Sequence, residues 1–340
     1  MKIKPSRILM ASTAAAALFG GCADEKSSIT LNGAGASFPA PVYQSWSHTY
    51  SESHPGTRVN YQSLGSGAGL NQLKADTVDF AGSDDPLTLE EQKAAGLTQF
   101  PMLTGGVVVI VNVPGVASDA LRLDRATLAA IFLGKITNWS APEIKKLNPE
   151  IQLPDLAITV VRRADASGTS FIFTDYLSKI SPEWRDTVGS GSSVKWPTGI
   201  GGQKNPGVCN SVMKINGAIG YTEYTYAVEA KIATVQLENH DGAFVAPTPA
   251  SFAASAAGAD WENAPGFYMV LTDQPGAESW PITGVTYVLM RNDVDEKTAA
   301  ELIKYFRWCF DAGQATARRL NYVPLPANVV SLIENRVFNR

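Results

Sequence analysis

Short apolar runs and helical apolar spacings alternate along this chain, and Gly/Ser loops separate them. Val42, Trp46 and Tyr50 recur at every fourth position, so they would share one face of a helix. The β-branched run 107–111 is typical of a strand buried on both faces. The same reasoning predicts strands at 29–31, 58–62, 78–82, 156–163, 218–221 and 285–290, and helices at 42–51, 70–76, 128–133, 171–178, 251–257 and 297–313. This alternation predicts an α/β protein with helices packed on a sheet.

Three Ser/Gly loops each precede a predicted helix, around Ser37, Ser66 and Ser167. A helix N-terminus has unpaired N–H groups and a partial positive charge, so it suits an anion. A serine at this place can equally be an N-cap, so each loop alone has a purely structural explanation. Three such loops, one of them just after Arg162-Arg163, favour an oxyanion site.

Composition and charge narrow the class of protein. The chain has 340 residues, of which 45% are apolar and 18% charged, as in a folded protein rather than a disordered one. Its 28 basic and 32 acidic residues give a net charge of -4, which argues against a nucleic-acid binder. The length suggests about two domains.

The N-terminus resembles a bacterial lipoprotein signal. Three basic residues precede the uncharged, mostly apolar run 8–19, which is too short to span a bilayer. Gly20-Gly21-Cys22 then offers small residues before a cysteine. We expect residues 1–21 to be removed, Cys22 to carry the lipid, and 22–28 to be a polar spacer. The protein would then be exported to the periplasm or cell envelope and touch the membrane only through its anchor. An ordinary secretory signal with an incidental cysteine is the alternative.

The two later cysteines, Cys209 and Cys309, leave two possibilities open. They could form a disulfide in an oxidising compartment if the fold brings them together. They could equally remain separate thiols packed as small apolar side chains.

Motifs of enzymes and of metal sites are missing from the sequence. Leu64 stands where a G-x-S-x-G elbow needs glycine, and Leu70 and Phe38 interrupt two possible dinucleotide fingerprints. The three histidines, at positions 48, 54 and 240, form no metal-binding motif. We therefore predict no enzymatic activity, no metal and no cofactor.

A series of longer motifs runs in order along residues 29–330. They are Gly33-Ala34-Gly35-Ala36-Ser37-Phe38-Pro39-Ala40-Pro41, Tyr61-Gln62 with Gly65-Ser66-Gly67, Thr77-Val78-Asp79-Phe80 with Ser83-Asp84, Gly134-Lys135-Ile136 with Trp139, Arg162-Arg163-Ala164-Asp165-Ala166-Ser167-Gly168-Thr169, Val194-Lys195-Trp196-Pro197, Gly217-Ala218-Ile219-Gly220-Tyr221 and Trp280-Pro281-Ile282-Thr283. Together they resemble the phosphate-binding proteins of bacterial high-affinity phosphate (Pst) ABC transporters.

The resemblance implies a two-lobed periplasmic-binding-protein fold of type II. Each lobe would be a mixed sheet flanked by helices, with the ligand in the cleft between them. Lobe I would hold 29–103 plus 282–340 and lobe II 104–281. The chain crossings near Leu103-Thr104-Gly105 and Pro281-Ile282-Thr283 would form the hinge. The implied function is binding of inorganic phosphate by a monomer and its delivery to the permease and ATPase subunits of an importer.

The resemblance also implies which residues hold phosphate. The expected ligands are Ser37, the N–H of Phe38, Ser66, Asp84, Arg163, Ser167, Gly168 and Thr169. Arg163 offers fixed donors that match an oxyanion, and Asp165 would hold it in place. An ionised Asp84 can only accept a hydrogen bond, so it would favour a protonated phosphate over a fully ionised sulfate.

Three other functions stay open from the sequence. The chain could bind a related oxyanion such as molybdate, sulfate or a phosphonate. It could be an enzyme, such as a phosphatase, on the same fold, although no motif supports this. It could also be a surface lipoprotein with an additional adhesion or signalling role.

Overall fold

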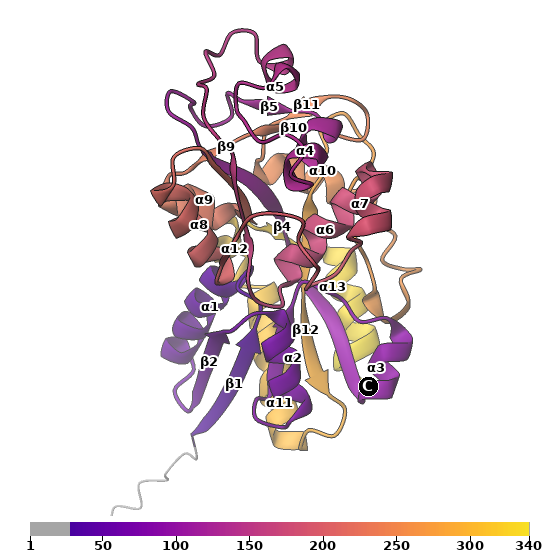
Figure 1. The fold of residues 1–340 in the computed structure, drawn as a ribbon. Helices are drawn as coiled ribbons and strands as arrows, with labels where there is room; N and C mark the ends of the chain where they lie inside the picture. Colours follow the sequence, from indigo (N-terminus) through magenta and orange to yellow (C-terminus); the bar gives the residue numbers. More distant parts are fainter. Residues whose placement is uncertain (1–27, 340) are drawn as a thin grey trace, which may run out of the picture.

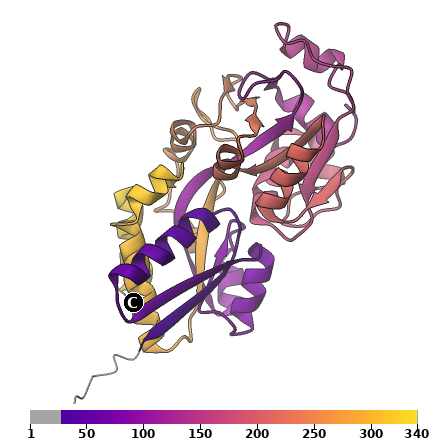
Figure 2. The same ribbon diagram turned by 90° about the vertical axis from the view of Figure 1, so that its left-hand side faces the viewer.

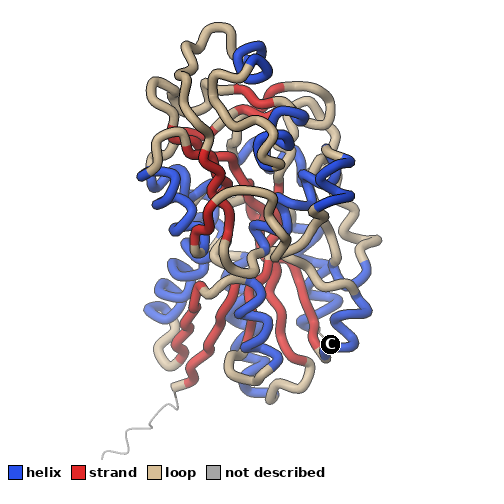
Figure 3. Tube along the Cα trace, viewed as in Figure 1, coloured by secondary structure: helices blue, strands red, loops and turns tan. Residues whose placement is uncertain are grey.

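The computed structural model describes residues 28–339. The expected leader 1–21 and the expected lipidation site Cys22 lie outside the described residues. The main sheet has ten strands in the order β2-β1-β3-β12-β4-β8-β6-β7, with β9 and β13 also paired to β4 (Figures 1 and 3). These strands are β1 (Ile29–Gly35), β2 (Thr57–Ser63), β3 (Phe80–Ser83), β4 (Leu97–Asn112), β6 (Thr159–Arg163), β7 (Ile200–Gly202), β8 (Ala218–Glu223), β9 (Ala233–Thr234), β12 (Thr283–Arg291) and β13 (Val323–Pro324).

Helices cover the sheet, and a small second sheet lies at the end of the molecule that is uppermost in Figure 1. The helices are α1 (Ala40–Ser53), α2 (Ser66–Lys74), α3 (Leu89–Ala95), α4 (Arg125–Phe132), α5 (Pro142–Leu147), α6 (Gly168–Ile180), α7 (Pro182–Thr187), α8 (Lys204–Lys214), α9 (Tyr224–Ala230), α10 (Pro249–Ala256), α11 (Glu296–Phe310), α12 (Gln314–Arg319) and α13 (Ala327–Ile333), with short turns η1 (Pro265–Phe267) and η2 (Glu334–Phe338). The second sheet is formed by β5 (Arg122–Leu123), β10 (Gln236–Glu238) and β11 (Phe244–Val245). The predicted α/β class is confirmed.

We call the part built on β1, β2 and β3 the first lobe and the part built on β6, β7 and β8 the second lobe. In the first lobe, α2 lies on one face of the strands, and α1 and α11 lie together on the other (Figure 2). The apolar stripe predicted for α1 is buried there, with Val42, Trp46 and Tyr50 at most 2% exposed. Burial of these large side chains is the main force that fixes α1 on the sheet.

Strands β4 and β12 join the two lobes. The first part of β4 pairs with β12, whereas residues 107–112 pair with β8 in the second lobe. Thr283 of β12 lies opposite Gly106 of β4, so the two chain crossings lie side by side. The Trp280 indole N–H donates to the backbone oxygen of Val107 (2.9 Å) and ties the crossings together.

The lobes also touch away from these crossings. The backbone oxygen of Gly266, which lies between β11 and β12 in the chain, accepts from the side-chain amides of Gln92 (2.9 Å) and Gln99 (3.0 Å) in the first lobe. The Tyr287 hydroxyl donates to the oxygen of Met269 (2.8 Å). Part of the segment 104–281 therefore packs against the first lobe.

The main departures from the predicted elements have local causes. Only 107–111 of β4 was predicted, because Pro101 and Gly105-Gly106 interrupt the apolar pattern before it. The strand accommodates Pro101 through a register shift between Thr286 and Tyr287 on its partner. Helices α3, α5, α7, α8, α9, α12 and α13 were not predicted. All of these have 11 or fewer residues, too few for a clear apolar period.

The two described cysteines do not pair. Cys209 and Cys309 are both free and buried, on α8 and α11. This confirms the interpretation as separate thiols. Among residues 28–339, no helix is long and apolar enough to cross a bilayer, and no three His, Cys, Asp or Glu side chains are grouped to hold a metal ion.

Candidate functional site

The eight expected ligand residues converge between the two lobes. Parallel pairing of β1 with β2 and β3 brings the loops after these strands to one edge, where ligands of such folds bind. The end of β6 and the start of α6 face this edge from the second lobe. The Ser66 hydroxyl accepts from the N–H of Gly168 (3.0 Å) across the lobes. A Cβ atom on Gly168 would lie 2.6 Å from Asp84 Cβ, so only glycine fits.

The three Ser/Gly loops are not equivalent. Ser167 is the N-cap of α6, and its hydroxyl accepts from the N–H of Ser170 (3.2 Å). Ser37 and Ser66 cap no helix, because the N-cap positions of α1 and α2 are Pro39 and Gly65, without side-chain caps. Their hydroxyls face the opposite lobe instead. The N-cap role that could explain such a serine therefore applies to Ser167 but not to Ser37 or Ser66.

Two tyrosines hold the backbone of the first loop. The Tyr226 hydroxyl donates to the oxygen of Ser37 (2.7 Å), and the Tyr322 hydroxyl donates to the oxygen of Phe38 (2.7 Å). The C=O and N–H of a trans peptide point in opposite directions. Anchoring the Ser37 oxygen therefore fixes the direction of the Phe38 N–H. Neither tyrosine was predicted from the sequence, because both come from segments distant along the chain.

Arg163 is 3% exposed and lies at the end of β6. Its Nε and Nη2 atoms donate to the two carboxylate oxygens of Asp165 (2.8 and 2.5 Å). Burial raises the pKa of Asp165, but the hydrogen bonds and charge of Arg163 outweigh it and hold that pKa below its ordinary value. The pair fixes the guanidinium plane and leaves Nη1 with only a long contact, 3.4 Å to Asn205 Oδ1.

Asn205, at the start of α8, is a site residue that the sequence analysis missed. It is fully buried. Its Nδ2 lies 3.1 Å from the Ser37 hydroxyl and 3.5 Å from the Thr169 hydroxyl, and its Oδ1 faces Arg163. It therefore contacts expected ligands from both lobes. The available signal was the glycine-rich stretch Gly199-Ile200-Gly201-Gly202 just before α8, which includes β7.

Asp84 supplies the acceptor of the site and is 2% exposed. Its Oδ1 accepts from the Thr286 hydroxyl (2.8 Å), whereas its buried Oδ2 has no hydrogen-bond partner. Burial raises the pKa of Asp84 to about 7, although Thr286 and Arg163 both lower it. A buried polar atom without a partner is rare and needs an explanation. A ligand that donates one hydrogen bond would provide it.

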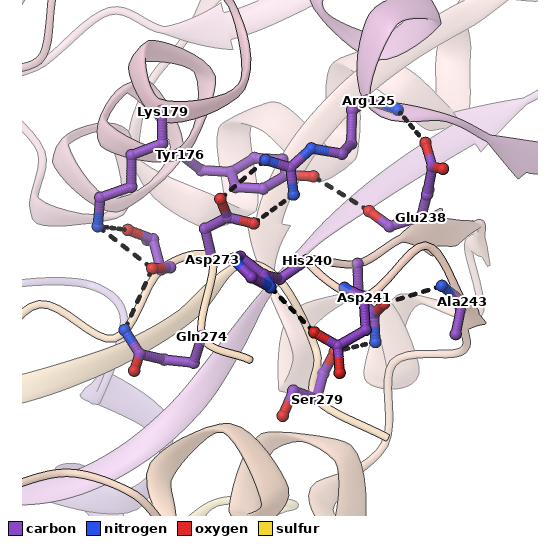
Figure 4. A network of polar contacts seen from close by, with 12 residues as sticks. Arg125, Tyr176, Lys179, Glu238, His240, Asp241, Ala243, Asp273, Gln274 and Ser279 are labelled. Carbon is purple, nitrogen blue, oxygen red and sulfur yellow. Dashed lines mark hydrogen bonds and ion pairs between the residues drawn. The ribbon is translucent and has the colours of Figure 1, made fainter. Parts of the chain in front are cut away.

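The second lobe anchors α6 at the end away from the site. Lys179 of α6 donates to the hydroxyl of Thr272 (2.7 Å), and beside it Arg125 of α4 forms two hydrogen bonds with Asp273 (2.5 and 2.8 Å), as Figure 4 shows. These contacts join α4, α6 and the segment before β12.

The arrangement suits a tetrahedral oxyanion with one protonated oxygen. The donors are a guanidinium, four hydroxyls and backbone N–H groups at a helix N-terminus, all nearly buried. Such donors bind oxyanions in water-poor sites. Asp165 is taken up by Arg163, so Asp84, with its unpartnered Oδ2, matches a single donor on the ligand.

Comparisons with known proteins show which proteins this chain is similar to in sequence and in fold. The PBP superfamily domain matches residues 21–310. The phosphate-binding protein PstS of Pasteurella multocida is 47% identical over 306 residues, which cover 90% of this chain and 89% of that protein. Two solved structures share the fold. The periplasmic phosphate-binding protein PfluDING, bound with phosphate, has a TM-score of 0.71 at 19% identity, with 90% of this chain and 93% of that chain covered. An ABC-type phosphate transport receptor from Vibrio cholerae has a TM-score of 0.58 at 21% identity, with 87% and 100% covered.

The structural likenesses show the fold alone, since both identities are low. The match to the superfamily domain and the close relative together cover most of the chain. The chain therefore belongs to the PBP superfamily and, within it, to the family of phosphate-binding proteins named PstS.

Proposed function

We propose that this chain binds inorganic phosphate between two lobes, with 29–103 plus 282–340 as lobe I and 104–281 as lobe II. The adjacent crossings at Gly106 and Thr283 support this division and would serve as the hinge. The relative from Pasteurella multocida is named a phosphate-binding protein, and its 47% identity supports the same ligand here.

The proposed ligand set divides into donors and one acceptor. The donors are the hydroxyls of Ser37, Ser66, Ser167 and Thr169, the N–H of Phe38 and the guanidinium of Arg163. The N–H of Gly168 would join them by turning from Ser66 Oγ to the ligand. The acceptor is Asp84. The observation that carries the proposal is its buried Oδ2, which has no partner although it faces the N-terminus of α6. A P–OH group would donate to it, whereas sulfate has only acceptors to offer. The mismatch with sulfate would cost about 1–3 kcal/mol or more.

The proposed role is delivery of phosphate to the permease and ATPase subunits of an ABC importer. The chain would act as an exported monomer, a binding protein rather than an enzyme. It would be held at the membrane by lipid on Cys22. Uptake of labelled phosphate by cells that lack their own binding protein tests the delivery step. Incorporation of a labelled fatty acid, lost in Cys22→Ala, tests the anchor.

Calorimetry on the dialysed protein tests the binding site. Phosphate should bind one to one and at least tenfold more tightly than sulfate at pH 8, where only about one-tenth of the protein is protonated at Asp84 and can donate to sulfate. Arg163→Ala should reduce phosphate affinity at least 100-fold, because it removes the guanidinium and also leaves the partly buried Asp165 without its cationic partner. The matched control is Arg185→Ala, at an exposed arginine of α7 that pairs only with Asp186. Equal affinity for both anions, or wild-type binding by Arg163→Ala, would overturn the proposal.

A further inference from the structure

A buried carboxyl group, Glu223, lies next to the proposed phosphate site without touching it. Glu223 ends β8, opposite Val107 of β4, and is fully buried. Its Oε1 accepts from the N–H of Thr225 (3.0 Å), and its Oε2 lies 3.1 Å from the Tyr322 hydroxyl. No ion pair involves Glu223 within the part of the chain that the structure describes. A buried carboxylate without a cationic partner is strongly disfavoured.

The distances around the Tyr322 hydroxyl indicate whether Glu223 is ionised or neutral. The single proton of Tyr322 has two candidate acceptors, the oxygen of Phe38 at 2.7 Å and Glu223 Oε2 at 3.1 Å. The shorter distance is the usual one for an O–H···O bond, so the proton lies toward Phe38. The contact between Tyr322 and Glu223 is then a hydrogen bond only if Glu223 donates it.

On the other side of Glu223, the Thr225 hydroxyl also has one proton and two candidate acceptors. The Thr225 hydroxyl lies 2.6 Å from the oxygen of Leu320 and 3.2 Å from Glu223 Oε1. Its one proton is therefore directed to Leu320. An ionised Glu223 would keep only the Thr225 N–H as a full donor, whereas a neutral Glu223 satisfies every atom of the group.

We propose that Glu223 is a positioning residue of the phosphate site that works as a neutral carboxylic acid. It donates its proton to the Tyr322 oxygen, so the Tyr322 proton stays on the carbonyl of Phe38. This inference rests on the proposed phosphate site, in which the loop of Ser37 and Phe38 supplies donors. When Glu223 ionises, its carboxylate competes for the Tyr322 proton, because hydrogen bonds to a charged acceptor are stronger. The Phe38 carbonyl is then released and the loop loosens.

The surroundings of Glu223 favour the neutral form at neutral pH. Burial raises the pKa of Glu223 to about 8, against the lowering effect of the hydrogen bond from the Thr225 N–H, and the charge of Asp84 adds to the rise. The other titratable groups that interact with it are neutral in their ordinary state: Cys209 on α8 and Tyr224 and Tyr226 on α9. Phosphate binding should therefore weaken as the pH rises through about 8.

Glu223→Gln tests the proposal, because glutamine keeps one acceptor and one donor but cannot ionise. Phosphate affinity is measured by calorimetry at several values between pH 6.5 and 9.5 in the wild type, in Glu223→Gln and in Glu143→Gln. Glu143 is exposed on α5 and serves as the matched control. The ionisation of free phosphate affects all three proteins alike, so it cancels when their pH profiles are compared.

We expect near wild-type affinity for Glu223→Gln at pH 6.5. Between pH 7 and 9, the wild type and Glu143→Gln should lose three- to tenfold more affinity than Glu223→Gln, since the competent fraction falls about tenfold for one group that titrates near 8. The same pH profile in the wild type and in Glu223→Gln would overturn the proposal. A tenfold or larger loss of phosphate affinity in folded Glu223→Gln at pH 6.5 would also overturn it, because phosphate binding would then require the negative charge of Glu223.

Tyr322→Phe provides a second test if Glu223→Gln does not fold. It keeps the ring that packs on Phe38 but removes the hydroxyl between Glu223 and the loop. It should bind phosphate more weakly at pH 7 and show no extra loss above pH 8. If phosphate affinity in Tyr322→Phe depended on pH as in the wild type, the proposal would be overturned. A wild-type protein that does not bind phosphate at any pH would instead refute the proposed function itself.

Discussion

Sulfate binding should depend on the protonation of Asp84. This carboxyl is buried, its Oδ1 is occupied by the Thr286 hydroxyl, and its Oδ2 has no partner. In the ionised form Oδ2 is only an acceptor, and so is every sulfate oxygen. In the protonated form Oδ2 can donate to sulfate. Because burial raises the pKa of Asp84 to about 7, sulfate affinity should increase as the pH falls through this value.

The size of the effect follows from the fraction of protein that is protonated at Asp84. If only this fraction binds sulfate, the apparent affinity is proportional to it. With a pKa of about 7, roughly nine-tenths of the protein is protonated at pH 6 and about one-tenth at pH 8. The expected loss is therefore about tenfold, or ~1.4 kcal/mol.

Calorimetric titration with sulfate between pH 6 and 8 measures this slope directly, because sulfate does not titrate in this range. Asp84→Asn should bind sulfate with nearly constant affinity, since its amide donates at every pH, and its phosphate/sulfate selectivity should fall. Asp186→Asn, at an exposed position on α7, should keep the wild-type slope. Constant sulfate affinity in the wild type, or the same slope in Asp84→Asn, would refute the reasoning.

Three further predictions concern other residues. Asn205→Ala should weaken phosphate binding about tenfold, because one to two hydrogen bonds that position Ser37 and the guanidinium are lost; calorimetry within twofold of wild type would contradict this. Thr286→Val removes the hydroxyl that lowers the pKa of Asp84, so the sulfate profile should shift to higher pH, and an unchanged midpoint would argue against that role. Cys209 and Cys309 should react with a thiol reagent such as DTNB only after unfolding, since both are buried and burial raises the pKa of Cys209 to about 11; rapid labelling of the native protein would be the contrary result.

Much of this protein can be read from local sequence. The apolar spacing predicted α1 and α11, and the Gly/Ser loops indicated where β1, β2 and β6 end. These features depend on neighbours within a few residues, where backbone and side-chain preferences act directly. The resemblance added the ligand residues one by one, and the structure brings them together between the lobes. What the residue types alone offered was an oxyanion site built from hydroxyls, an arginine and helix N-termini.

Only the tertiary structure decided how these groups are held. Asp84 takes its one donor from Thr286, 202 positions away, and Ser37 contacts Asn205, 168 positions away. Tyr322 reaches the Phe38 carbonyl over 284 positions. No local pattern encodes such pairs, because they arise when strands of one sheet bring distant loops to the same edge. Burial at that edge removes water from Asp84 and Glu223, which raises the pKa of both and leaves each dependent on a few specific hydrogen bonds. The sequence thus determined which chemical groups are present, and the exclusion of water by packing decided their charge and their partners.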